Sequence, residues 1–152
     1  FNKNKTDFGI GGANITKVRL TDKSFAPLSW VVGGEEVCLM IEVEATIDLC
    51  HYIVGFETRD RLGQIIFADN TFITYIDNPQ SLSAGETSTG KFNFIMPVLP
   101  TGNYSICVGV AEGTQGDHVM RHWVHDAMIL KVHASMVCLG LVQVPMLDIT
   151  LK

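Results

Sequence analysis

The chain has 152 residues, enough for one domain with a hydrophobic core. Its net charge is −5 and its 11 Lys and Arg residues are scattered, which argues against a nucleic-acid partner, because phosphate binding needs clustered positive charge. No apolar run reaches the ~18–20 residues of a membrane-spanning helix, and no signal peptide is visible.

Short strands separated by turn residues account for most of the chain. The strands that we predict cover 15–20, 36–45, 52–60, 65–68, 72–76, 87–96, 103–111 and 125–133, with an irregular edge piece at 25–32. No segment has helical periodicity over the length that a stable helix needs. This pattern predicts an all-β fold, an antiparallel β-sandwich of immunoglobulin-like (Ig-like) type. The sandwich would occupy residues 13–152, and residues 1–12 resemble a linker remnant.

Strand 103–111 alternates bulky and small residues. One face holds the core candidates Tyr104, Ile106, Val108 and Val110, and the other holds Ser105, Cys107, Gly109 and Ala111. A Gly-x-Tyr step that enters a strand is typical of the corner of a Greek-key sandwich, where the tyrosine hydroxyl bonds back to nearby backbone. The small-residue face predicts a shallow floor on which an extended ligand can lie.

Neighbouring strands would place charged groups beside this floor. Alternation puts Val54, Phe56 and Thr58 inward and Gly55, Glu57 and Arg59 outward, and it puts Ala127, Ile129 and Lys131 outward on strand 125–133. Sugars are held by planar polar groups together with an aromatic ring. The candidate sugar contacts are therefore Glu57, Arg59, Asn70, Tyr75, Trp123 and Lys131. The alternative is that small residues only let a covering strand lie close.

Four cysteines, at positions 38, 50, 107 and 138, raise the question of a disulfide. Cys38 and Cys107 fall on strands where antibody domains have their bridge, but alternation points both outward from opposite sheets, too far apart to bond. Four free thiols and a reducing compartment are the expectation. Trp30 is expected to fill the core.

The remaining groups do not predict chemistry. His118, His122 and His125 are expected in a loop, where no further ligand completes a familiar metal spacing, so we predict no metal and no cofactor. Adjacent carboxylates on a strand point to opposite faces, which argues against a glycosidase pair. Residues 136–152 add apolar stretches that need burial, either as a further strand of the same sheet or by exchange with a second copy in a dimer.

At this point the chain resembles the C-terminal domain of the ATPase subunit of O-antigen ABC transporters (the Wzt type). The residues that carry the resemblance are Phe8-Gly9-Ile10-Gly11-Gly12, Gly34-Glu35, Val54-Gly55-Phe56 with Arg59-Asp60 and Gly63, Asn70-Thr71, Leu99, Gly102, Tyr104, and the tail Gly140 to Pro145. Asp7 and Gly12 depart from the family pattern, in which a basic and an acidic residue would be expected.

The resemblance implies a binding domain without catalytic activity. Such a domain holds the exported O-antigen polysaccharide at its chain terminus, forms a homodimer with exchanged C-terminal strands, and works with the ATPase domain of the same chain and a membrane permease subunit. It would act in the cytoplasm at the inner face of the inner membrane. No phosphate-binding loop of the ATPase type is present in this sequence. The rival expectation is a structural adaptor, a sandwich that dimerises without binding a glycan.

Overall fold

The computed structural model describes residues 7–151, and these form strands and turns without a helix. None of them therefore lies in a helix long and apolar enough to cross a membrane. The ten strands are β1 (Asp7–Phe8), β2 (Ala13–Asp22), β3 (Glu36–Ala45), β4 (Leu49–Cys50), β5 (Tyr52–Arg59), β6 (Ile65–Asn70), β7 (Ser81–Leu82), β8 (Thr87–Ile95), β9 (Gly102–Gly113) and β10 (His118–Val132).

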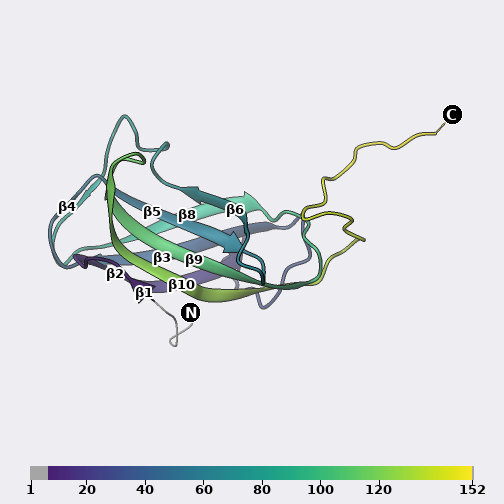
Figure 1. Cartoon of the computed structure of the whole chain (residues 1–152), viewed down its shortest axis with the longest axis horizontal. Helices are drawn as coiled ribbons and strands as arrows, with labels where there is room; N and C mark the ends of the chain where they lie inside the picture. Colours follow the sequence, from purple (N-terminus) through teal and green to yellow (C-terminus); the bar gives the residue numbers. More distant parts are fainter. Residues whose placement is uncertain (1–6, 152) are drawn as a thin grey trace.

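The strands form antiparallel sheets. The larger sheet has the order β1-β10-β9-β5-β6, a second has the order β2-β3-β8, and β4 pairs with β7. Strands distant in sequence lie side by side, as β5 and β9 do in the larger sheet (Figure 1). The all-β prediction is confirmed.

One hydrophobic core lies between the two larger sheets. It takes alternate residues of β3 from one sheet and of β5 and β9 from the other, because successive side chains of a strand point to opposite faces. The residues that alternation places inward on these three strands are all buried: Val37, Leu39, Ile41, Val43, Val54, Phe56, Thr58, Tyr104, Ile106, Val108 and Val110. The alternation of these three strands therefore predicted the core correctly.

The corner before β9 has the predicted hydrogen bond. The Tyr104 hydroxyl donates to the carbonyl oxygen of Pro100 at 2.8 Å. Tyr104 is buried, and this burial raises the pKa of its phenol, with further contributions from the negative charges of Cys138 and Asp60. The hydroxyl therefore keeps its proton and can hold the turn against the start of the strand.

Strand β10 differs from the prediction. It begins at His118, so the expected loop around the three histidines is wrong. Its register with β9 shifts between Met120 and His122 and again between Val124 and Met128, and Asp126 has a φ of 50°. The second shift places three residues of β10 opposite one residue of β9. Simple alternation fails across such a bulge, and Ala127, predicted to point outward, is buried.

Two other local predictions are wrong. Residues 72–76 form turns, because the Tyr75 amide bonds back to the Thr71 carbonyl at 3.2 Å and breaks the extended run. Trp30 is 53% exposed and packs edge-on against His133. It therefore does not fill the core.

The cysteines are all free. Cys38 lies on β3 and Cys107 on β9, in different sheets, as expected. Both are nevertheless buried. Burial raises the pKa of the Cys38 thiol, although the charge of Lys91 opposes this.

The leading segment joins the larger sheet. Asp7 and Phe8 pair with Val124 and Trp123 of β10. Within the predicted linker remnant, 1–12, residues 7–8 therefore form a strand. Residues 1–6 lie outside the described residues.

The C-terminal tail has little contact with the sheets. The Gln143 amide donates to the Val98 carbonyl at 2.8 Å, and the Cys138 thiol reaches the same oxygen at 4.0 Å. Beyond these contacts the tail extends away from the strands (Figure 1). Most of its apolar side chains are exposed, including Leu139, Leu147 at 105% and Leu151 at 100%. In this chain alone, the tail does not form a further strand of the parent sheets.

Candidate functional site

The outward face of the larger sheet carries one row of residues across four strands. Trp123 of β10 pairs with Gly109 of β9, which pairs with Gly55 of β5, which pairs with Asn70 of β6. Paired residues of neighbouring strands point to the same face. The row therefore has two glycines in its centre, an aromatic ring at one end and an amide at the other.

The two glycines keep this part of the face low. A Cβ on Gly109 would lie 2.9 Å from Cζ3 of Trp123 and still nearer to Cε3, so the indole occupies the space that a side chain would fill. A Cβ on Gly55 would lie 3.0 Å from Cβ of Asn70 and 3.2 Å from the Asp69 carbonyl. Neither position accepts a side chain without movement of a wall of the site.

This face is hollowed into a trough of about 420 Å³. We call this hollow the trough, and its lining comes from β5, β6, β9, β10 and the β9–β10 turn. It is lined by Ile53, Gly55, Phe56, Glu57, Ala68, Asp69, Asn70, Gly109, Ala111, Gln115, His118, Met120 and Trp123. Three of the predicted site residues, Glu57, Asn70 and Trp123, are thus brought together.

Local hydrogen bonds orient the two ends of the row. The Asn70 Oδ1 atom accepts from the Phe72 amide at 2.9 Å, and among residues 7–151 its Nδ2 group has no partner. The indole Nε1–H of Trp123 donates to Nδ1 of His125 at 3.4 Å. The amide therefore offers a donor to a ligand, while the indole offers the surface of its half-buried ring.

Glu57 and Arg59 form an ion pair on the same face. Nε and Nη2 of Arg59 both donate to Oε2 of Glu57, at 3.0 and 2.6 Å. The hydrogen bond to Glu57 raises the pKa of the Arg59 guanidinium, outweighing the effect of burial. Oε1 of Glu57 and Nη1 of Arg59 have no hydrogen-bond partner among residues 7–151, so this pair presents an acceptor oxygen and an NH2 donor group.

Arg59 lies outside the trough, in a separate hollow. That hollow also contains Ser105 and Asp126, which are hydrogen-bonded to each other. Lys131 belongs to the same face, because it pairs with Asn103 beyond the row of Arg59 and Ser105. It lines neither the trough nor the hollow that contains Arg59. The charged candidates therefore follow the face away from the trough.

Tyr75 lies in a different hollow from Trp123. It projects from the turn after β6 into a second depression of about 260 Å³ that shares Ile53 with the trough. From the sequence, Trp123, Tyr75 and Tyr52 are candidates for the ring of one site, and the structure places Trp123 in the trough and both tyrosines in the second depression.

Among the lining residues outside the predicted sugar contacts are three from one hairpin. Met120, Gln115 and His118 belong to the β9–β10 hairpin, whose tip borders the trough. A long hairpin was hidden by the glycines and polar residues of 112–117, which resemble a loop. The apolar residue Val119 is the sequence signal that could have indicated a longer strand. In the structure it pairs with Glu112.

The three histidines point to different surroundings. His118 borders the trough, and His125 packs against Trp123. His122 accepts from the Ile15 amide through Nδ1 at 2.9 Å, and its Nε2 bonds to Asp7 at 3.0 Å. Within the described part of the chain, no three metal-ligating side chains gather in one place.

Two acidic residues, Glu57 and Asp69, line the trough, but their carboxylates do not converge. Glu57 pairs with Cys107, on the outward face. Asp69 instead pairs with Phe56, whose side chain is in the core. The two carboxylate side chains therefore extend from opposite faces of the sheet, whereas a glycosidase needs two that face the same bond.

Comparisons of sequence and of structure with known proteins both match the same domain. A family profile described as the Wzt C-terminal domain matches residues 4–144. A crystal structure of the C-terminal domain of Wzt superposes with a TM-score of 0.89 at 20% sequence identity, over 99% of this chain and 91% of that chain. A structure described as a β-galactosidase from Bacteroides fragilis reaches a TM-score of 0.46 at 14% identity, over 80% of this chain and 18% of that chain, which supports no inference. No curated protein sequence matches.

Proposed function

The chain belongs to the Wzt C-terminal domain family, and on this basis we propose that it binds the terminus of an O-antigen polysaccharide and couples that glycan to export by an ABC transporter. The trough is the observation that carries the proposal. It combines the ring of Trp123, a floor of glycines and the amide of Asn70. Aromatic rings pack against the C–H face of sugars, and planar polar groups bond their hydroxyls.

The contacts on this face favour weak but selective binding. Asn70, Glu57 and Arg59 each have an unused donor or acceptor, and each hydrogen bond contributes only ~0.5–1.5 kcal/mol net. One trough therefore holds a glycan weakly, and two troughs acting on one transporter gain affinity through avidity. The domain binds its glycan without converting it.

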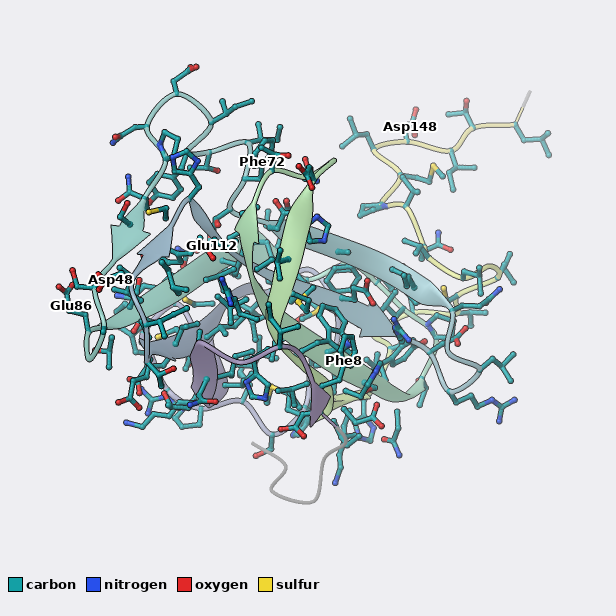
Figure 2. The ribbon with its side chains drawn as sticks, turned by 60° about the vertical axis from the view of Figure 1, so that its left-hand side comes forward. Phe8, Asp48, Phe72, Glu86, Glu112 and Asp148 are labelled. Atoms are coloured by element: carbon teal, nitrogen blue, oxygen red, sulfur yellow. The ribbon has the colours of Figure 1, made fainter. Side chains whose placement is uncertain are left out.

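The proposed scaffold is an Ig-like sandwich that forms a homodimer by exchanging residues 136–152. The bond from Tyr104 to the Pro100 carbonyl supports the Ig-like assignment, since it is the corner typical of such sandwiches. The exposed apolar tail supports the exchange, and Asp148 marks its path away from the body (Figure 2). Among the described strands, β6 and β8 each have one unpaired edge to which a strand of a second copy could add.

The setting follows from the family. The proposed partners are an ATPase domain of the same chain, a membrane permease subunit and the polysaccharide, and nucleic acid is not among them. The proposed location is the cytoplasm, at the inner face of the inner membrane. Four free thiols are compatible with a reducing compartment.

A calorimetric titration with matched tryptophan variants tests the proposal. The titrant is the O-polysaccharide of the source organism, with and without its terminal modification. Wild type and Trp30→Ala should bind, because Trp30 lies away from the trough, and Trp123→Ala should bind at least several-fold more weakly. A folded wild-type protein that binds no form of the polysaccharide would contradict the proposal and favour a structural adaptor.

A further inference from the structure

A second hollow lies next to the trough. It is formed by the turn after β6 and by the start of the β9–β10 turn, and it measures about 260 Å³. Its ring is Tyr75, which is 44% exposed. Polar side chains of His51, Gln80 and Thr114 also line it. Like the trough, this hollow presents an aromatic ring beside hydrogen-bonding groups.

The two hollows adjoin. Ile53 lines both of them. On one side Asn70 lines the trough and Thr71 lines the second hollow. On the other side Gln115 lines the trough and Thr114 lines the second hollow. Adjacent residues of the same two segments therefore line both hollows, with Ile53 at the border between them.

Hydrogen bonds fix the shared wall. Oδ1 of Asn70 accepts from the Phe72 amide, so one bond links an end of the trough to the wall of the second hollow. Thr71 forms two hydrogen bonds with Val54 of β5. Its amide donates to the Val54 carbonyl at 3.0 Å, and its Oγ1 accepts from the Val54 amide at 3.1 Å. Figure 2 shows Phe72 near the tip of the β9–β10 hairpin, the other wall.

The turn that carries Tyr75 is also held by its own backbone. The Tyr75 amide donates to the Thr71 carbonyl at 3.2 Å, and its carbonyl accepts from the Asn78 amide at 3.1 Å. Gln80 donates through Nε2 to the Asn78 carbonyl at 2.8 Å. The ring is thus presented by a bonded turn, which lowers the entropy lost when a ligand packs on it.

We infer that the trough and the second hollow form one extended glycan site, with Trp123 packing on one sugar and Tyr75 on a sugar further along the same chain. This rests on the proposed function and adds to it, because it assigns a second subsite and sets a minimum length for full affinity. A ligand that ends at Ile53 uses only the trough, while a longer ligand crosses this residue and gains the contacts of the second hollow.

Binding as a function of ligand length tests this inference. The probes are two fragments of the O-polysaccharide that share the same terminus, one a terminal disaccharide and the other spanning two repeat units. Calorimetry or NMR titration gives Kd for wild type, Tyr75→Ala, Trp123→Ala and Ile73→Ala. Ile73 is the matched control, because it lies in the same turn, is 66% exposed and lines neither hollow.

Wild type should bind the longer fragment more tightly than the disaccharide. Tyr75→Ala should weaken the longer fragment about 3- to 10-fold and leave the disaccharide unchanged, whereas Trp123→Ala should weaken both, and Ile73→Ala neither. Equal effects of Tyr75→Ala on both fragments, or none on either, would overturn the second subsite and leave the trough intact. Failure of wild type to bind either fragment would instead overturn the proposed function.

Discussion

Substitution of Gly109 by alanine should damage the trough while leaving the fold intact. The new Cβ would lie 2.9 Å from Cζ3 of Trp123 and nearer to Cε3, whereas carbon atoms in contact are ~3.5–4.0 Å apart. The indole must therefore move by about 1 Å or more. Because the ring is half-buried, it can turn toward solvent, and the floor of the trough rises beneath it.

The two effects on stability largely cancel. Overpacking costs ~1–3 kcal/mol, and the lower end applies where the neighbour can move outward. Replacing a glycine within a strand by alanine returns ~0.5–1 kcal/mol. The free energy of unfolding should therefore change by less than about 1 kcal/mol. Loss of an aligned aromatic contact, worth ~0.5–1.5 kcal/mol, should weaken glycan binding about 2- to 10-fold.

Tryptophan fluorescence can report the displacement directly. In a Trp30→Phe background, Trp123 is the one remaining tryptophan of the chain, so Gly109→Ala should shift its emission to longer wavelength. Gly116→Ala is the matched control, because a Cβ there meets nothing within 4 Å. Unchanged emission together with unchanged glycan affinity in Gly109→Ala would refute the assignment of Trp123 as the wall above this floor.

Three further predictions concern stability and assembly. Tyr104→Phe removes the bond to the Pro100 carbonyl and should lower the free energy of unfolding by about 1 kcal/mol in urea denaturation. Since the folded state raises the pKa of this phenol above 10.0, its contribution is complete below pH 10 and should be lost as pH rises through the folded pKa, so the melting temperatures of wild type and variant should converge there. Burial alone would raise the pKa of Glu112, but its bonds from Arg121 hold it below 4.5. The stabilisation of the fold by the Glu112 carboxylate should be present above pH 4.5 and fall at lower pH. On acidification below pH 4.5, a Glu112→Gln variant should therefore show a smaller fall in melting temperature than wild type. Deletion of 136–152 should convert a dimer into a monomer in light scattering, and an unchanged mass would contradict strand exchange.

The core was predictable from sequence because alternation is a property of local backbone geometry. In β3, β5 and β9 no bulge interrupts the inward residues, so the period of two held from end to end. Gly102 and Tyr104 likewise predicted the corner, since that motif is contained in a few adjacent residues. The outward glycines at 55 and 109 predicted a low floor by the same reasoning.

What was missed depends on contacts between distant segments. The shifts in β10 arise in its pairing with β9, and they decide that Ala127 is buried and that His122 bonds to Ile15. Likewise, the separation of Tyr75 from Trp123 depends on how the turn after β6 meets the β9–β10 hairpin. The pattern of residues along one strand does not predict the distances between segments that are far apart in the sequence.

The most direct test of the central claim is an NMR titration of the wild-type domain with its O-polysaccharide, following backbone amides and the indole Nε1–H. Saturable shifts are expected at Gly55, Asn70, Gly109 and Trp123, on the outward face of the larger sheet. Saturable shifts confined to β2, β3 and β8, or no shifts from a folded protein, would contradict a glycan site in the trough.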